Sequence, residues 1–284
     1  MAIGTGAARI VRADDLEPTW TVKQAKEPGF MRSLITWVGG PEGYINTNPG
    51  VAVETERCVI GLMRMPAGNR QAGVHVHSVT EIYVILKGRC ESFDGEGRRH
   101  VAGALDCLYI PAGVPHGVRT AGDEELELIW VHDAIERWGV STYLEGPGPF
   151  PVKDEVRLIR FDDLEPQWTA PGAKDVGTLR WTVNWVAGPE GRDRGAGFAA
   201  TNPRMALGLT VVSPWNRHLP GLHAGDETTV VLSGAAIVEI GDDRQRIGRL
   251  DAIHRPAGCE SGLRNAGDAP LYLLWVREAP EAGE

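Results

Sequence analysis

Residues 73–88 read GVHVHSVTEIYVILKG, and this stretch decides the fold of the chain. Alternate side chains of a β-strand share a face, so His75 and His77 are predicted to point the same way across the residue between them. Glu81 follows four residues after His77, close enough to lie on the next part of the same strand or hairpin. The stretch therefore predicts a β-structure that gathers imidazole and carboxylate groups.

A second stretch, residues 103–117 (GALDCLYIPAGVPHG), adds a further candidate ligand, His116, behind a Pro-Ala-Gly turn signal. A single histidine on a strand is more often a packed or exposed side chain than a ligand, but several independent positions that coincide favour a metal site. The predicted metal ligands are three imidazoles and one carboxylate: His75, His77, Glu81 and His116. This set suits Fe(II), Mn(II), Ni(II), Co(II) or Zn(II) and leaves coordination positions open for a substrate.

Together the two stretches resemble the two sequence motifs of the cupin family. The first motif of the family, a glycine, His-x-His, Glu and a second glycine, reads here from Gly73 to Gly88, with a shorter spacer after the first glycine. The second motif, Gly, Pro-x-Gly and His, reads from Gly103 to His116, and Thr120 stands where the family has Asn. The resemblance implies a small antiparallel jelly-roll barrel (a double-stranded β-helix) with the four ligands inside, near its open mouth.

An internal repeat predicts two such barrels. The sequence DDLEPTW at 14–20 returns as DDLEPQW at 162–168, and other segments return with the same spacing. We therefore predict an all-β bicupin with an N-terminal cupin domain, 1–148, whose metal site is intact. The C-terminal cupin domain, 149–284, is predicted to have a degenerate site and a structural role, replacing the partner subunit that a single cupin needs.

The degenerate site keeps two of the four ligand types. The equivalent positions hold His223 for His77, Glu227 for Glu81, Gly221 for His75 and Ser261 for His116. Glycine and serine bind transition metals poorly, so a second metal is not expected. His218 and His254 lie nearby in the sequence, and the spacing leaves open whether they, His223 or Glu227 retain a role.

Segments outside the barrels are expected to be extended. Each repeat begins with an arm, from Asp14 to a turn at Trp37 and from Asp162 to a turn at Trp185. We expect each arm to pack on the barrel of the other half, as arms do in similar bicupins. Helical patterns are few, and the best candidate, residues 133–143, is weakened by an internal glycine.

Composition narrows the class of protein. A chain of 284 residues with 42% hydrophobic residues can fill two cores, and its 36 Gly and 19 Pro fit an all-β chain with many turns. A net charge of −9 without a basic run argues against nucleic-acid binding. No apolar stretch approaches membrane-spanning length, the N-terminus lacks a secretory signal, and the four cysteines show no close pairing, so we predict a cytoplasmic protein without membrane contact.

Candidate catalytic residues follow from their proximity to the motifs. Arg119 follows the second motif and is a candidate to bind a substrate carboxylate at the rim, with a plain surface position as the alternative. Tyr83 and Tyr109 lie on ligand-bearing strands and are candidate proton donors, with core packing as the alternative. His132 beside Asp133 resembles an acid–base pair, but its place at a strand end predicts an exposed side chain.

The resemblance and the ligand set predict a metal-dependent enzyme with one divalent transition metal per chain, Fe(II) favoured over Mn, Ni or Zn. Its small-molecule substrate is expected to be anionic. The favoured reaction is that of a non-haem Fe(II) dioxygenase that cleaves a C–C bond in a small oxygenated or aromatic acid. A redox-neutral decarboxylase, isomerase, lyase or cyclase, or a non-catalytic small-molecule-binding cupin, are the alternatives. Monomer and homodimer are both compatible with the fused repeat.

Overall fold

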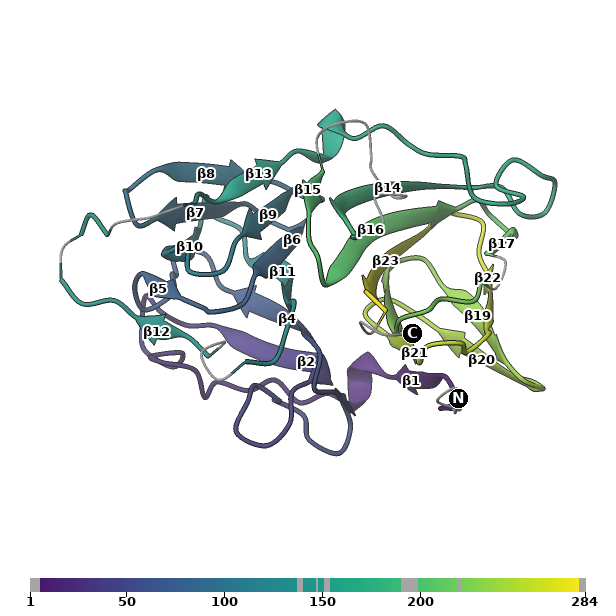
Figure 1. The fold of residues 1–284 in the computed structure, drawn as a ribbon, viewed down its shortest axis with the longest axis horizontal. Helices are drawn as coiled ribbons and strands as arrows, with labels where there is room; N and C mark the ends of the chain where they lie inside the picture. Colours follow the sequence, from purple (N-terminus) through teal and green to yellow (C-terminus); the bar gives the residue numbers. More distant parts are fainter. Residues whose placement is uncertain are drawn as a thin grey trace. The chain divides into compact units, whose positions relative to one another are not determined.

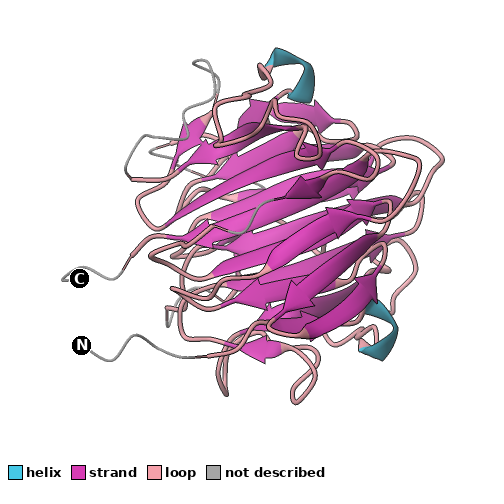
Figure 2. Ribbon diagram, turned by 90° about the vertical axis from the view of Figure 1, so that its right-hand side faces the viewer, coloured by secondary structure: helices cyan, strands magenta, loops and turns pink. Residues whose placement is uncertain are grey.

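The computed structural model describes residues 6–136, 140–146, 148–150, 154–189, 199–218 and 221–280. These residues form β-strands and loops, and their helical content is limited to two single turns, η1 (Ala13–Asp15) and η2 (Phe161–Asp163) (Figure 1 and Figure 2). The predicted all-β fold is confirmed. None of the helical segments in the described part of the chain has the length and apolar character needed to cross a bilayer.

One compact unit comprises residues 16–161. Its larger sheet has the strand order β13-β9-β6-β11-β4-β2-β3, and its smaller sheet has the order β12-β5-β10-β7-β8. The strands are β2 (Ser33–Gly39), β3 (Val53–Glu54), β4 (Val59–Met65), β5 (His75–Val76), β6 (Glu81–Lys87), β7 (Cys90–Asp94), β8 (Arg99–Ala102), β9 (Cys107–Ile110), β10 (His116–Thr120), β11 (Leu126–His132), β12 (Thr142–Tyr143) and β13 (Arg157–Ile159).

The core of this unit explains which way its functional side chains point. Tyr83 and Ile85 on β6 belong to a buried cluster that also includes Val118 from β10 of the other sheet. Side chains two apart on a strand share a face, so Glu81, at the start of β6, points into the same interior. Burial of such apolar side chains stabilises the fold by about 1.5–3 kcal/mol each and so fixes the face on which the site residues lie.

The other unit comprises residues 6–15 and 162–280 of the described chain. Its sheets have the orders β1-β21-β18-β23-β16-β14-β15 and β17-β22-β19-β20. The strands are β1 (Arg9–Val11), β14 (Arg180–Ala187), β15 (Ala200–Thr201), β16 (Met205–Val212), β17 (Arg217–His218), β18 (Glu227–Ser233), β19 (Ala236–Ile240), β20 (Asp243–Ile247), β21 (Ala252–Arg255), β22 (Gly262–Asn265) and β23 (Leu271–Glu278).

Because of the pairing of two short strands, the two units are divided at other residues than the predicted boundary at 148/149. Strand β1, at the start of the chain, pairs with β21 of the second repeat, beside which Figure 1 shows it in purple. Strand β13, which precedes the second repeat, pairs with β9 of the first. Each short strand covers the edge strand of its sheet, whose backbone groups would otherwise lack partners on that side. Residues 6–15 therefore belong with the second repeat, and the first unit extends to residue 161.

An aspartate anchors the chain after each of these strands. Asp251 accepts a hydrogen bond from the backbone N–H of Ala13 at 2.8 Å and pairs with Arg12 at 3.2 Å. In the other unit, Asp106 accepts from the N–H of Phe161 at 3.0 Å and pairs with Arg160 at 2.9 Å. Asp251 and Asp106 thus anchor the chain in the same way, directly after β1 and after β13.

The arms that follow these anchors are tied to their own repeat. The guanidinium of Arg32 donates to the carbonyl oxygen of Lys23 at 2.9 Å, and Arg180 makes the equivalent bond to Pro171 at 2.7 Å. Each arginine thereby ties the first part of its arm to its own sheet. Of the predicted helix at 133–143, residues 137–139 lie outside the described chain, and its end forms strand β12 instead.

Candidate metal centre

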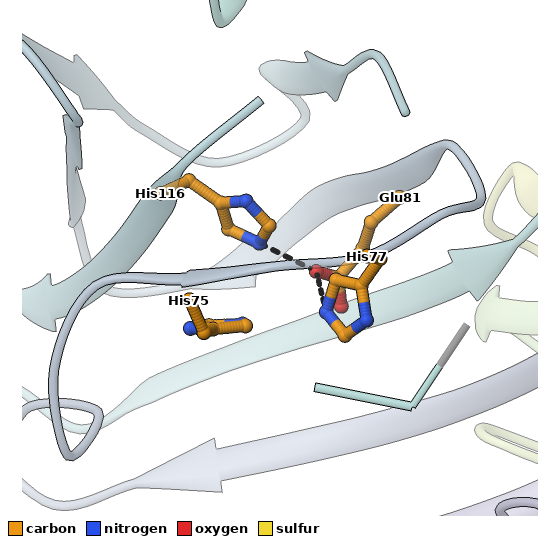
Figure 3. A group of neighbouring side chains, drawn as sticks. All are labelled: His75, His77, Glu81 and His116. Carbon is orange, nitrogen blue, oxygen red and sulfur yellow. Dashed lines mark hydrogen bonds and ion pairs between the residues drawn. The ribbon is translucent and has the colours of Figure 1, made fainter. Parts of the chain in front are cut away.

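Figure 3 shows the four predicted ligands gathered in the first barrel, with the ligand atoms of His75, His77, Glu81 and His116 all within 4.8 Å of one another. The Nε2 atom of His116 lies 2.8 Å from Oε2 of Glu81, and the Nε2 atom of His77 lies 3.2 Å from the same oxygen. All four side chains are buried. The structure therefore contains a four-residue metal-binding site at the predicted positions.

Strand register brings these residues together. His116 on β10 lies directly opposite His75 on β5, and such cross-strand neighbours share a face. The Pro-Ala-Gly turn is tied to the first motif because the N–H of Gly113 donates to the carbonyl oxygen of His77 at 2.7 Å. Gly113 has a φ of +79°, a left-handed conformation that glycine adopts without strain. The turn glycine of the second motif is thus needed to place His116 beside His77.

The hydrogen bonds of His116 test whether a metal fits. Its Nδ1 atom lies 2.8 Å from the carbonyl oxygen of Val114, which can only accept, so Nδ1 carries the proton. In the neutral ring, Nε2 is then a bare lone pair that faces the carboxylate of Glu81. Two lone pairs at this distance repel unless a proton or a metal cation lies between them. Neighbouring ligands at about 2.0–2.2 Å from a transition metal are about 3 Å apart, so the residues fit a bound divalent ion.

The pKa values of the cluster favour the ligand forms. Burial alone would raise the pKa of Glu81, but the charge of His77 and hydrogen bonds from the surrounding histidines hold it well below its ordinary value. Burial, helped by the neighbouring imidazoles of His116 and His77, holds the pKa of His75 well below its ordinary value. The site therefore presents an ionised carboxylate and a neutral imidazole, the forms that bind metal.

His132 lies beside the ligand cluster, although the sequence predicts an exposed side chain. It is 1% exposed rather than solvent-exposed, and its Nε2 atom lies 3.4 Å from Oε1 of Glu81. Its Nδ1 atom lies 3.1 Å from the hydroxyl of Tyr44. Asp133 accepts a hydrogen bond from the N–H of Thr80 at 2.9 Å and so helps to fix the loop before Glu81. The expected partner of His132 is therefore replaced by Glu81, which lies opposite it in register on β6.

Tyr83 faces the metal centre, as one of its two sequence interpretations predicts. It lies two residues after Glu81 on β6, lines the same pocket, and its hydroxyl is 3.5 Å from the side-chain nitrogen of Gln71. Burial, and then the charge of Glu81, raises the pKa of Tyr83 well above its ordinary value. The hydroxyl is therefore a proton-bearing hydrogen-bond donor at neutral pH.

Tyr109 and Arg119 lie on the opposite faces of their strands. Tyr109 lies opposite Ile82, the residue after Glu81, and therefore on the other face of the sheet. The guanidinium of Arg157 lies 5.9 Å from the centre of the Tyr109 ring. Arg119 is three residues after His116, an odd step that reverses the strand face. Its side chain is 42% exposed and pairs with Glu91 at 2.8 Å. Neither residue lines the pocket at the metal centre.

The pocket beside the ligands is small and largely apolar. It encloses a volume of about 60 Å³. Its apolar wall consists of Val22, Leu34, Ile45, Met63 and Trp130. Its polar groups beyond the ligands are Arg32, Gln71, Tyr83, His132, Ser141 and Tyr143. Of these, Gln71, Arg32 and Tyr143 were not singled out by the sequence, because only the pairing of distant strands brings them to the site.

The equivalent position of the second unit holds arginines. Glu227 is flanked on the neighbouring strands by Arg255 and Arg277, which lie opposite it in register. Arg277 pairs with Oε2 of Glu227 at 2.8 Å, Arg255 pairs with Oε1, and Nε2 of His223 lies 3.1 Å from Oε2. Burial alone would raise the pKa of Glu227, but the two arginines and His223 lower it to about 2.

The remaining histidines of the second unit take different places. His254 lies opposite Thr228 and is hydrogen-bonded to its hydroxyl at 3.0 Å, so it faces away from Glu227. His218 lies on β17, opposite Leu263. Burial and then the charge of Arg255 lower the pKa of His218 to about 4.

Comparisons with known proteins agree with this architecture. The cupin domain family matches the chain twice, at residues 61–132 and 209–277. None of the curated proteins matches the sequence significantly.

Three solved structures illustrate the likeness of the fold. A putative glyoxylate-induced protein from Pseudomonas aeruginosa has a TM-score of 0.66 at 12% identity, with 99% of this chain and 91% of that chain covered. The pirin YhhW from Escherichia coli, solved with nickel(II), has a TM-score of 0.64 at 14% identity, with 96% and 99% covered. Oxalate decarboxylase from Bacillus subtilis, with Mn(II) centres, has a TM-score of 0.61 at 16% identity, with 98% and 78% covered. At these identities the likeness shows the fold alone.

Proposed function

Since the chain belongs to the cupin family and carries the cupin domain twice, we propose that its first barrel is the active site of a metal-dependent enzyme acting on a small acid. The favoured reaction is that of a non-haem Fe(II) dioxygenase that cleaves a C–C bond. When bound, Fe(II) would be held by His75, His77, Glu81 and His116 and would supply Lewis acidity and the electrons for O₂ chemistry.

The composition of the pocket carries this proposal. Of the described side chains that line it, Glu81 is the only carboxylate, and it belongs to the ligand set. The two tyrosines hold their protons, because burial raises the pKa of both Tyr83 and Tyr143. A redox-neutral isomerase or lyase needs a protein group that accepts and returns a proton. A pocket with apolar walls and few such groups suits oxygen chemistry better.

The residues around the ligands select the substrate. Arg32 is buried at the pocket wall and donates to the hydroxyl of Tyr143 at 3.4 Å. Its positive charge, together with the ammonium of Lys23 that lies 4.3 Å from the Tyr143 ring centre, attracts an anion. The small volume limits the size of that anion, and Trp130 forms part of the apolar wall beside the ligands.

One observation favours a redox-neutral enzyme as the second candidate. His132 lies beside Glu81 and contacts the Tyr44 hydroxyl, so the site holds one buried imidazole outside the ligand set. A decarboxylase, isomerase, lyase or cyclase with Mn, Ni or Zn would use that imidazole as its acid or base. The structural likeness to a Mn(II) oxalate decarboxylase is compatible with this candidate.

Oxygen uptake tests the proposal. The protein is purified without a nickel column, loaded with Fe(II) under nitrogen, and offered small 2-hydroxy, 2-oxo and phenolic acids in an oxygen electrode. We expect substrate-dependent O₂ consumption that His77→Ala abolishes and its matched control, His223→Ala, retains. Product formation under nitrogen with Mn, Ni or Zn would instead support the redox-neutral candidate. Saturable binding without product, whatever the metal, would show a non-catalytic binding protein.

A further inference from the structure

The second barrel carries a buried cluster of charge where the first barrel holds its metal ligands. Arg255 takes the place of Ile110, since each lies opposite the glutamate from the neighbouring strand. Arg277 takes the place of His132 by the same register on the other side. Two guanidinium groups therefore converge on Glu227.

The charge of this cluster matches that of a loaded metal centre. A divalent ion and one carboxylate carry a net charge of +1, and two guanidinium groups and one carboxylate carry the same. An excess of buried positive charge is costly unless an anion compensates it.

The buried arginine of the cluster, Arg255, keeps one hydrogen-bond donor without an acceptor in the described part of the chain. Oε1 of Glu227 accepts from Arg255 and from the hydroxyl of Thr229, and Oε2 accepts from Arg277 at 2.8 Å. The Nε atom of Arg255 is buried and has no hydrogen-bond acceptor in the described part of the chain. Since guanidinium groups cannot accept, the Nε–H of Arg255 is satisfied by an additional oxygen from outside the described part of the chain.

The cluster is accessible to a small solute. The side chains of Arg277 and His223 are 29% and 22% exposed, whereas Glu227 behind them is buried. Gly221 and Ser261 stand where the first barrel has His75 and His116, so two imidazole rings are replaced by smaller side chains.

We propose that the second barrel binds a small monocarboxylate at Arg255, Arg277 and His223, without a metal. The planar N–H fork of arginine matches a carboxylate, and one negative charge neutralises the net charge of Glu227 and its two arginines. Inorganic phosphate, with nearly two negative charges, overcompensates that charge. The second barrel is thus an acid-binding site without metal chemistry, distinct from the pocket of the first barrel.

Formate, the smallest carboxylate, is the probe for this site. The full chain, loaded with diamagnetic Zn(II), is titrated with formate while the arginine Nε–H resonances are followed by NMR. The Arg255 resonance, assigned by its loss in Arg255→Ile, is expected to shift saturably. Arg277→Gln should weaken formate binding by roughly tenfold or more, because a charge-assisted pair is lost. Arg244→Gln, at an exposed arginine on β20 of the same unit, should leave it unchanged.

Two further variants separate this site from the first barrel and from misfolding. His77→Ala should keep the Arg255 shift, since the formate that causes it binds elsewhere. If Arg277→Gln does not fold by thermal unfolding, Arg277→Lys, which keeps the charge but loses the planar fork, should still weaken binding. An Arg255 resonance that does not move, unchanged affinity in the Arg277 variant that folds, or tighter binding of inorganic phosphate than of formate would overturn the proposal.

Discussion

Glu81 and His132 lie opposite each other on β6 and β11, with Nε2 of His132 3.4 Å from Oε1 of Glu81. The other carboxylate oxygen, Oε2, faces His77 and His116. His132 therefore holds the carboxylate in the orientation that presents Oε2 to the ligand cluster. Tyr44 in turn fixes the ring of His132 through Nδ1.

We expect His132→Gln to weaken metal binding by about 10–100-fold, because residues that orient a ligand commonly contribute that much to metal affinity. Tyr44→Phe should have a smaller effect in the same direction, since it removes only the support of His132. Competition with a chelator of known affinity measures both. His254→Gln, a buried histidine of the other unit, is the control; a loss of affinity there equal to that of His132→Gln would contradict the orienting role.

The matched histidines His77 and His223 distinguish the two barrels. His77→Ala should remove the bound metal, because a ligand is lost from a buried site. His223→Ala should leave the metal content unchanged, because Glu227 at that position is already paired with Arg255 and Arg277. Elemental analysis of the purified variants decides this, and loss of one metal equivalent from His223→Ala would show a second metal site.

The glycines that end the first motif and its repeat predict a difference in stability. Gly88 and Gly234 have φ values of +72° and +90°, so alanine is strained at both. A Cβ at Gly88 would lie 2.5 Å from the carbonyl oxygen of Glu125, whereas at Gly234 the nearest atom is 3.3 Å away. Gly88→Ala should therefore lower the free energy of unfolding by about 1–3 kcal/mol more than Gly234→Ala. Denaturant unfolding of both variants measures the difference, and equal losses would argue against the clash.

The His218 imidazole makes the fold sensitive to mild acid. Its pKa falls from 6.5 to about 4 in the folded chain, through burial and the charge of Arg255. Between these values the unfolded chain binds a proton that the folded chain does not, so stability decreases as the pH falls from 6.5 towards 4. The loss is about 1–3 kcal/mol for this partly buried ring. His218→Gln should remove this part of the pH dependence, measured by urea unfolding at several pH values; an unchanged slope would show that other groups cause it.

The metal centre could be predicted because its chemistry is local in the sequence. His75, His77 and Glu81 lie within one short stretch, and a single turn glycine places His116 beside them. Tyr83 also follows from the strand period, since it is two residues from Glu81. Arg119 is three residues from His116 on β10, so the alternation of strand faces places its side chain on the opposite face from His116.

Residues brought in by distant strands could not be predicted in this way. His132 reaches Glu81 only because β11 pairs with β6 in one particular register. Arg255 and Arg277 reach Glu227 for the same reason. The spacing of residues along the chain does not determine these strand registers, because they depend on how the whole barrel packs. The pairing of β1 with β21 and of β13 with β9 could not be predicted either, because strands of three residues are too short to show a sequence pattern.

The pairing of β1 with β21 and of β13 with β9 determines where the chain can be cut into two fragments. A fragment ending at residue 148 would lack β13 and leave the edge of β9 open, while the complementary fragment would lack β1 and leave β21 open. Open edges of this kind promote aggregation, so separately expressed halves are expected to be poorly soluble. A circular permutant that starts at Asp162 and joins residue 284 to residue 1 would make each unit a continuous stretch of chain. The order of the repeats in the gene is thus only one of two ways to encode the same pair of barrels.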